Sequence, residues 1–392
     1  MSTRVLMVTR ETGEDRRYGL GRSVLPLFEP MHALGVQARY FCQEDMPAAA
    51  SGQRAQWSAR IATLPGVRGR VSRQNLVNAW LERLQVGHAA ARLATREGYT
   101  HVHAHDPWLA CGVAWGLGMN AARIRWGFTQ HGFGSYSHAT HEDGLTQGPS
   151  AQAWLRRIER FLCARAGWVT APTALSLQQL ARDLGLPRAP AHWHHVPHAR
   201  PALVAADAAR KQQARQDLGY GADDIVVLAV GRLVPLKCFD HIVRACAGQP
   251  DARVRLLLLG GGPTEWIEAL ARELGFGDRL RIASAQDVGP YYHAADIYVS
   301  ASATESFGMA NLEALCAGLP AICSAVGGVP EVVGDAAWLV TNDVPTLTRS
   351  LAALAADAQL RDLWSRRGIE RAASWPTAQE IAQRYVAIYQ AA

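Results

Sequence analysis

Several residues whose types suit the binding of a phosphorylated sugar lie in one stretch of this sequence, residues 296–331. Glu305 and Glu313 are separated by seven residues, and the pair Gly327 and Gly328 follows them. A carboxylate accepts hydrogen bonds from sugar hydroxyls, and glycines before a helix expose backbone N–H groups to an anion. Two glutamates at an arbitrary spacing are more often a solvated loop residue and a helix-surface residue. The spacing alone leaves both interpretations open.

The residues around these glutamates predict two strands, each followed by a helix. The runs 296–301 and 320–324 are short, apolar or β-branched, and bounded by polar residues or turns. Ser306 is the predicted N-cap of a helix over 307–317, and Pro330 favours the first turn of a second helix. Both helices would begin at one edge of a sheet, where their N-termini attract an anion.

The run E-S-F-G-M-A-N-L-E-A-L-C-A-G-L-P, followed by G-G-V-P-E, resembles the donor site of glycosyltransferase family 4. Members of this family are retaining enzymes. The resemblance implies an α/β fold of the GT-B type, with two facing Rossmann-like doubly wound domains and a cleft between them. It also implies a nucleoside diphosphate sugar as donor. The residues that would contact this donor here are Glu305, Ser306, Phe307, Gly308, Met309 and Glu313.

A second group of candidate residues follows the apolar run 225–230, which predicts a buried strand. Arg232 can grip a diphosphate with its forked guanidinium, and Lys237, one of only two lysines in the chain, can supply a compact charge. An ordinary solvated pair is the alternative. The pattern G-R-L-x-x-x-K, which starts at Gly231, resembles the diphosphate-binding segment of family 4. That family usually has glycine after this lysine, where Cys238 stands here.

The base-binding part of the donor site departs from the family pattern. A strand is predicted over 280–283. At its end this chain has Ile282-Ala283-Ser284, where the family commonly has Phe-x-Gly. We expect Ile282 to lie near the base, but the choice between UDP and GDP stays open.

The first 198 residues alternate strand and helix patterns, which predicts a mostly parallel sheet with helices on both faces. The first strand is predicted over residues 4–9. A glycine-rich loop with Gly19 and Gly21, followed by Arg22, comes before a helix that ends near residue 34. Glycines of a simple turn are one interpretation of this loop. In family 4 such a loop lies between the donor and acceptor sites.

Histidines end two further predicted strands, 100–105 and 127–130. Ligands bind at the carboxyl ends of strands in doubly wound sheets, which favours functional roles for His103, His105 and His131. Hydrogen-bonded structural histidines are the alternative. Strand-His-Gly resembles the family position beside the anomeric carbon of the donor. The predicted catalytic residues are therefore His131, Arg232, Lys237 and Glu305.

The acceptor side is predicted from position alone. A segment over 132–150, with Glu142 and Asp143 at its centre, is expected to be mobile and to close over an acceptor. Arg22 and Asp106 complete the candidate acceptor residues. The run 187–201 has four prolines and predicts an interdomain connection without a helix. It contains Pro197-His198-Ala199 where the family usually has P-N-G.

Two domains are expected from the length of 392 residues. An acceptor-binding domain would hold residues 1–198 and the C-terminal helix, about 376–392. A donor-binding domain would hold residues 199–375. Seven scattered cysteines predict reduced thiols, and no run of residues is long and apolar enough to span a bilayer. We therefore expect a cytoplasmic protein.

The charge of the two halves differs. Residues 1–198 hold 22 arginines and 13 acidic residues, whereas the rest holds 18 basic and 21 acidic residues. A basic first half favours an anionic partner, such as the inner membrane surface or a lipid-linked acceptor. Coding bias toward arginine is the alternative. A nucleic-acid partner is disfavoured, since no binding module is recognisable. Four arginines that lie close together in this half are Arg60, Arg68, Arg70 and Arg73.

The predicted function is transfer of a hexose from a UDP- or GDP-sugar to a hydroxyl of a glycan or lipid-linked acceptor, in polysaccharide, lipopolysaccharide or glycolipid assembly. Neither a metal nor another cofactor is expected, because the histidines lack the H-E-x-x-H spacing. A non-catalytic sugar-nucleotide-binding partner and a sugar-nucleotide epimerase are the alternatives. A dinucleotide oxidoreductase is disfavoured, because neither half begins with G-x-G-x-x-G.

Overall fold

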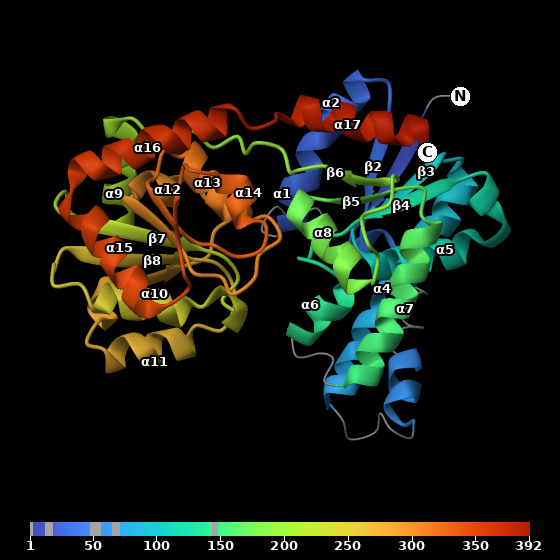
Figure 1. Ribbon diagram of the computed structural model, residues 1–392, viewed down its shortest axis with the longest axis horizontal. Helices are drawn as coiled ribbons and strands as arrows, with labels where there is room; N and C mark the ends of the chain where they lie inside the picture. The colour runs from blue at the N-terminus through green and yellow to red at the C-terminus, as the bar shows by residue number, and fades with distance from the viewer. Residues whose placement is uncertain (1–2, 12–18, 48–55, 65–70, 143–147) are drawn as a thin grey trace. The chain divides into compact units, whose positions relative to one another are not determined.

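A computed structural model of the protein shows two compact units (Figure 1). Unit 1 comprises Met1–Ala199 and Pro376–Ala392, and unit 2 comprises Arg200–Trp375. The structure describes residues 3–11, 19–47, 56–64, 71–142 and 148–392.

Unit 1 is built on a parallel sheet of six strands in the order β2-β1-β3-β4-β5-β6. The strands are β1 (Arg4–Val8), β2 (Gln37–Phe41), β3 (His101–Ala104), β4 (Arg125–Thr129), β5 (Val169–Ala171) and β6 (Trp193–His195). The predicted strands 4–9, 100–105 and 127–130 are confirmed within one or two residues. Strand β6 was not predicted, because it lies in the proline-rich run 187–201.

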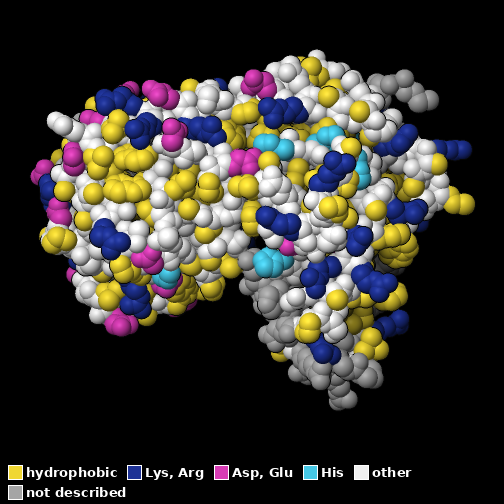
Figure 2. Space-filling view, viewed as in Figure 1, with side chains coloured by type: hydrophobic (Ala, Val, Ile, Leu, Met, Phe, Trp, Pro, Cys, Tyr) yellow, Lys and Arg dark blue, Asp and Glu magenta, His cyan; other side chains and the backbone are white. Residues whose placement is uncertain are grey.

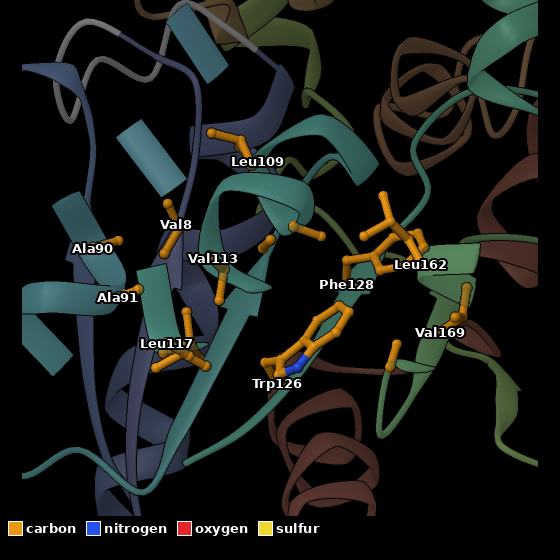
Figure 3. Close-up of a cluster of buried hydrophobic side chains, with 14 of the residues drawn as sticks. Val8, Ala90, Ala91, Leu109, Val113, Leu117, Trp126, Phe128, Leu162 and Val169 are labelled. Atoms are coloured by element: carbon orange, nitrogen blue, oxygen red, sulfur yellow. The ribbon is translucent and has the colours of Figure 1, made fainter. Parts of the chain in front are cut away.

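Both faces of this sheet are buried. Leu6 and Val8 of β1 pack in one apolar cluster, whereas Val5 and Met7 pack in another on the opposite face. Alternate residues of a strand point to opposite faces, so a strand apolar at every position must be covered on both sides. Figure 3 shows the first cluster, where side chains of β1, β4 and β5 meet those of three helices.

The helices of unit 1 cover both faces of its sheet (Figure 1). They are α1 (Gly19–Val24), η1 (Leu25–Leu27), α2 (Phe28–Ala33), η2 (Gln43–Asp45), α4 (Val71–Glu97), α5 (Pro107–Leu117), η3 (Gly118–Ala122), α6 (Tyr136–Glu142), α7 (Pro149–Arg165), α8 (Ala174–Asp183) and α17 (Ala378–Ala391). Residues 56–62 are also helical. The last helix, α17, packs in the same cluster as α2.

Two predictions for unit 1 are wrong. Gly19 and Gly21 belong to the first turns of α1 and not to a loop. Residues 132–150, for which no helix was predicted, contain α6 and the start of α7, while their mobility and closure over an acceptor stay predictions. In α6, the N–H groups of Tyr136 and Ser137 donate to the buried carboxylate of Glu159 at 2.8 and 3.4 Å, a contact too distant in sequence to predict.

Unit 2 contains a second parallel six-stranded sheet, in the order β12-β11-β10-β7-β8-β9. Its strands are β7 (Ile225–Val230), β8 (Val254–Leu259), β9 (Leu280–Ala283), β10 (Ile297–Ser300), β11 (Ala321–Ser324) and β12 (Trp338–Val340). Its helices are α9 (Ala208–Leu218), η4 (Pro235–Lys237), α10 (Phe239–Ala247), α11 (Glu265–Glu273), η5 (Gly277–Arg279), α12 (Gly289–Ala294), α13 (Met309–Cys316), α14 (Val329–Val333), α15 (Val344–Ala356) and α16 (Ala358–Ala373).

The sheet of unit 2 is also buried on both faces. Val226 and Leu228 of β7 pack with α12 and α13, whereas Val227 and Ala229 pack with α10 and α15. All seven cysteines of the chain carry free thiols. Across the described part of the chain, no helix combines the length and apolar character needed to cross a bilayer.

Candidate active site

The loops after the strands of unit 2 carry most of the predicted site residues. Because the strands are parallel, their carboxyl ends lie at one edge of the sheet, where doubly wound folds bind ligands. Arg232 and Lys237 follow β7, and Glu305 follows β10, which pairs with β7. The fold therefore brings Lys237 to Glu305, although 68 positions separate them in sequence.

Lys237 and Glu305 form an ion pair at this edge. Nζ of Lys237 donates to Oε2 of Glu305, and Oγ of Ser302 donates to the same oxygen at 3.4 Å. The Lys237 side chain is 24% exposed and that of Glu305 is 18% exposed. Both charged groups are thus held in place while remaining accessible to a ligand.

Backbone hydrogen bonds hold the loop of Glu305 between its two neighbouring loops. The N–H of Ala303 donates to the carbonyl of Leu236 at 2.8 Å, on the β7 side. On the β11 side, the N–H of Gly328 donates to the carbonyl of Glu305 at 2.9 Å. The loop is therefore fixed by main-chain contacts that require no particular side chain.

The start of the Arg232 loop requires a glycine at position 260. A Cβ atom added to Gly260, at the end of β8, would lie 1.8 Å from the carbonyl oxygen of Gly231. The loops after β7 and β8 thus cross in direct backbone contact. Beyond this crossing, Arg232 is exposed, and no hydrogen bond or ion pair engages its guanidinium within the described residues. Its charge is available to an anion.

Helix α13 begins at a different residue from the one predicted. The N-cap is Gly308, in a left-handed conformation with φ 80°, and no side chain caps the helix. The prediction that Ser306 is the cap is wrong, because the chain makes one further turn at Gly308 before it becomes helical. Met309 is then the first helical residue. The N–H groups of Asn311 and Leu312 donate to the carbonyl of Gly308 at 2.9 and 3.4 Å, so only the N–H groups of Met309 and Ala310 come before the first hydrogen bonds of the helix. The predicted helix start at the pair Gly327 and Gly328 is confirmed, with Gly328 as the N-cap of α14.

Glu313 and Phe307 lie deeper than Glu305. Glu313 is only 2% exposed, and the hydroxyl of Tyr292 donates to its Oε2 at 2.7 Å. Tyr292 lies on α12, so no feature of the sequence indicated this partner. Phe307 is also buried, and its ring meets that of Trp375 edge-on at 5.6 Å. These contacts set the position of the residues on either side of Gly308.

A column of four stacked histidine rings lies in unit 1. His103 stacks on His105 with ring centres 4.8 Å apart, His105 on His131 at 5.3 Å, and His131 on His198 at 5.5 Å. His105 Nδ1 and His131 Nε2 share a hydrogen bond of 3.1 Å. His103, His105 and His131 follow from the predicted strand ends, but His198 was noted only as a departure from the P-N-G turn.

The inner end of the column is anchored on the core. His103 shares hydrogen bonds with the hydroxyl of Tyr389 at 2.7 Å and with Oγ1 of Thr129 at 2.8 Å. Burial lowers the pKa of His105 to about 3 and that of His198 to about 4, with the imidazole of His198 acting in the same direction on His105. Burial and the adjacent His105 likewise hold the pKa of His131 well below its usual range. The column is therefore uncharged at neutral pH.

The contacts of Asp106 give it a structural role in unit 1. Its Oδ1 accepts from the N–H groups of Trp108 and Leu109 at 2.6 and 3.2 Å, which makes it the N-cap of α5. Its Oδ2 accepts from Nε of Arg83 at 3.1 Å, and both side chains are buried. A role for Asp106 toward an acceptor stays a prediction.

The remaining predicted residues are spread over both units. Arg22 lies in the last turn of α1, and the N–H of Gly21 donates to Oε1 of Glu11 at 3.2 Å. Ile282 lies in β9, partly buried. Asp143 and the side chain of Glu142 lie outside the described residues. No group of three or more metal-ligating side chains gathers at one point among the residues that the structure describes.

Two family models match this chain. The model for Glycosyltransferase Family 4 matches residues 18–198, and the model for Glycosyl transferases group 1 matches residues 210–371. Together they span most of the sequence. This chain belongs to glycosyltransferase family 4.

Relatives with assigned activities include D-inositol 3-phosphate glycosyltransferases. That of Mycobacterium sp. strain KMS is 33% identical over 252 residues, which cover 60% of this family 4 chain and 54% of the relative. That of Saccharomonospora viridis is 32% identical over 300 residues, which cover 70% and 66%. The chain thus spans about half the length of the first relative.

Solved structures of similar fold include sucrose-phosphate synthase from Thermosynechococcus elongatus, with a TM-score of 0.74 at 20% identity and coverage of 99% and 98% of the two chains. HepE from Anabaena, solved with UDP and glucose, has a TM-score of 0.72 at 17% identity and coverage of 98% and 99%. The predicted GT-B architecture of this family 4 chain is confirmed.

Cys238, which stands after Lys237 where family 4 usually has glycine, has an unusual backbone conformation. Cys238 adopts the left-handed conformation, with φ 46° and ψ 46°. Of the residues that the structure describes, it alone has a positive φ without being glycine. The conformation costs about 1–2 kcal/mol for a residue with a Cβ atom. The chain therefore retains a glycine-type turn at this position with a side chain that strains it.

Proposed function

We propose that this protein is a retaining glycosyltransferase that moves a hexose from a nucleoside diphosphate sugar to an acceptor hydroxyl. The observation that carries the proposal is the accessible pair of Lys237 and Glu305, with Arg232 nearby in sequence, at the carboxyl edge of the unit 2 sheet. Unit 2 would bind the donor, and unit 1 would bind the acceptor. Membership of family 4 supports this division.

The proposed chemistry rests on charge stabilisation of the leaving diphosphate. Lys237 and Arg232 would donate to phosphate oxygens as the bond to the anomeric carbon breaks, and the N–H groups of Met309 and Ala310 at the start of α13 would add to them. A preorganised donor in a partly enclosed site is worth a few kcal/mol in the transition state. Glu305, held next to Lys237, would accept hydrogen bonds from the sugar hydroxyls.

The nucleoside would contact residues that lie deeper in unit 2. Glu313 would accept from the ribose hydroxyls, and the hydroxyl of Tyr292 orients its carboxylate. Ile282 would contact the base. His131 would meet the hexose as a neutral imidazole, whose tautomer depends on the hydrogen bond with His105.

UDP-hexose is the donor that we propose to test first, because HepE was solved with UDP and glucose. The thermal unfolding midpoint of the purified protein would be compared with UDP, GDP and ADP at equal concentrations. Only a nucleotide that binds the folded state raises this midpoint. Release of UDP from UDP-glucose would then test catalysis, and NMR of the first sugar anomer released would test retention. The α anomer supports the proposal, whereas the β anomer contradicts retention.

We propose that the reaction needs no metal, because Arg232, Lys237 and backbone N–H groups can neutralise the diphosphate. Turnover should then be the same with and without EDTA. Loss of turnover on chelation that Mg²⁺ or Mn²⁺ restores would contradict this part of the mechanism.

The acceptor that we propose is an anionic glycan or lipid-linked hydroxyl compound, reached while unit 1 rests on an anionic membrane surface. The excess of arginine over acidic residues in the first 198 positions supports this choice. The curated relatives are named for a phosphorylated acceptor, inositol 3-phosphate, which agrees with an anionic class. Transfer assays with phosphorylated and neutral acceptors of equal size would test it.

A further inference from the structure

Helix α7 of unit 1 presents an unusual outer face. Trp154 is 53% exposed and Phe161 is 58% exposed, although both are large aromatic side chains. They lie seven positions apart, so two turns of the helix bring them to the same side. Isolated exposed aromatics are common, whereas aromatics gathered on one face indicate a binding surface.

The end of α5 and the following η3 add to this face. Trp115 of α5 is 66% exposed, and Met119 of η3 is 98% exposed. A groove of about 760 Å³ lies against α5 and α7, with Trp115, Trp154 and Phe161 among its lining residues. We call Trp115, Met119, Trp154 and Phe161, with the groove that three of them line, the aromatic face.

The rings of the aromatic face are supported from behind. Trp154 meets Trp80 of α4 edge-on at 5.9 Å, and Trp115 lies against His88 of α4 at 4.6 Å. The guanidinium of Arg165 lies 5.2 Å from the centre of the Phe161 ring. Because these contacts fix the rings while much of their surface stays in water, little side-chain entropy would be lost when a partner covers them.

Positive charge surrounds the aromatic face. Four arginines of α7 are exposed, and the only acidic residue of this helix, Glu159, is buried. Neither α5 nor η3 contains an acidic residue, and Arg123 and Arg125 that follow them are exposed. Figure 2 shows basic and hydrophobic side chains interspersed on unit 1, with few acidic ones on the visible face. The exposed arginines of α7 are Arg156, Arg157, Arg160 and Arg165.

We propose that the aromatic face and the arginines of α7 dock on an anionic phospholipid bilayer. Tryptophan favours the headgroup level of a bilayer, where its ring is covered and its N–H stays hydrated. Arginines at the same level pair with lipid phosphates. Helix α7 would lie in the plane of the interface, as amphipathic helices with basic and aromatic outer faces do.

A second copy of the chain suits this surface poorly. In a symmetric dimer the same patch meets itself, so the α7 arginines of one copy would face those of the other. No exposed acidic residue on α5, η3 or α7 could compensate them. Like charges brought together in this way oppose association.

This inference names the surface through which the membrane contact of the proposed function would occur. It differs from the cluster that the sequence suggested, Arg60 to Arg73, of which Arg68 and Arg70 lie outside the described residues. Vesicle binding needs no donor or acceptor. Failure to bind and failure to transfer sugar are therefore measured separately.

The test is co-sedimentation of the full chain with vesicles of phosphatidylcholine alone and with about one-third phosphatidylglycerol, at low and high salt. We expect binding to the anionic vesicles at low salt, weak binding to the neutral ones, and loss of binding at high salt. The substitutions Arg156→Gln, Arg157→Gln and Arg160→Gln together should weaken binding by about tenfold or more. Trp154→Gln with Phe161→Gln should weaken it as well and leave the salt dependence intact.

Matched controls come from unit 2, whose exposed residues include Arg210, Arg349, Arg366, Leu363 and Ile369. Changing these three arginines to glutamine removes the same charge elsewhere, and changing Leu363 and Ile369 to glutamine removes apolar surface elsewhere. Both control variants should bind like the wild type. Circular dichroism would confirm that every variant is folded.

Three results of the vesicle assay would each overturn the proposal. These are equal binding to both vesicle types, wild-type binding by the arginine variant, and equal weakening in the control variants. A dimer in light scattering that the Trp154→Gln, Phe161→Gln variant abolishes would assign the face to self-association instead. Binding to single-stranded nucleic acid with the same dependence on these residues, in the absence of vesicle binding, would also overturn it.

Discussion

The two lysines of this chain both pair with carboxylates of unit 2, at opposite ends of the same strand, β10. Lys211 contacts Asp296 just before the strand, with Nζ 2.7 Å from Oδ1, whereas Lys237 contacts Glu305 beyond its other end. Asp296 also accepts from the guanidinium of Arg215 and from the N–H of Val226. Three donors from the scaffold thus satisfy the carboxylate at the amino end.

The pair at the carboxyl end has a different setting. Both partners lie in segments that follow strands, and the guanidinium of Arg232 at the same edge has no hydrogen-bond or ion-pair partner in the described structure. Amino ends of parallel strands contribute to stability, while carboxyl ends hold ligands. The same two residue types therefore serve structure in one place and, in our proposal, chemistry in the other. Position on the sheet separates the two roles where residue type does not.

The strongest test of this comparison is turnover. Lys237→Ala should lower kcat by about a hundredfold or more, because it removes a preorganised cation from the leaving group. Lys211→Ala should leave kcat within about twofold, since its partner lies at the other end of the strand. Steady-state UDP release, with folding checked by circular dichroism, measures both. Equal losses of kcat in the two variants would contradict the assignment of different roles to the two lysines.

For stability we expect the opposite order, with the pair at the amino end of β10 contributing more than the pair at the carboxyl end. Asp296→Ala should lower the free energy of unfolding by about 2 kcal/mol, because Arg215, only 10% exposed in its side chain, loses its counter-ion. Glu305→Ala should change it by less than about 1 kcal/mol, since Lys237 can turn to solvent. Urea unfolding monitored by fluorescence gives both values. A larger loss in Glu305→Ala would show that the carboxyl-end pair also holds the fold together.

Unit 1 provides a third polar cluster, which has no charge to balance. The pKa of His105 is lowered to about 3 in the folded protein by burial, against an ordinary value of 6.5. The unfolded chain therefore takes up this proton first, so stability is full above pH 6.5 and is lost as pH falls toward 3. Between pH 7.5 and 5.5, His105 should account for about 1 kcal/mol of this loss.

The control for this pH dependence is His105→Gln, which removes the titrating group. Its unfolding free energy, measured in urea at pH 7.5, 6.5 and 5.5, should fall less steeply toward acid than that of the wild type. Parallel curves for the two proteins would mean that His105 is protonated in the folded state, which would contradict the neutral column.

The smallest effect concerns the residue after Lys237. Cys238→Gly should raise the free energy of unfolding by up to about 1 kcal/mol, because glycine removes the left-handed strain while adding some freedom to the unfolded chain. Cys238→Ala keeps the Cβ atom and should show no such gain. If glycine lowers kcat while it stabilises, the Cys238 side chain contributes to the placement of Lys237.

Local sequence predicted much of the framework around the candidate site. The run 225–230 becomes β7 and 280–283 becomes β9, because continuous apolar residues between polar turns leave few alternatives to a buried strand. The motif of Glu305 also predicted correctly that a strand and a helix flank it. These features depend on neighbours within about ten residues.

Tertiary structure decided which side chains act on one another. The N-cap of α13 is Gly308 and not the predicted Ser306, because backbone hydrogen bonds hold the loop of Glu305 against the loops on both sides of it. Glu313 is hydrogen-bonded to Tyr292 on another helix, and His103 is hydrogen-bonded to Tyr389, 286 positions away. Such partners are determined by packing of distant elements, on which periodicity and spacing carry no information.

The two lysines illustrate this limit. From the sequence, only the motif around Lys237 distinguished it from Lys211, the other lysine of the chain. Their opposite settings on β10 follow from the order β10-β7-β8 of the sheet, which is formed by strands far apart in the chain. The sequence determined which residues could carry charge at a strand end, and the parallel sheet decided which end each one occupies.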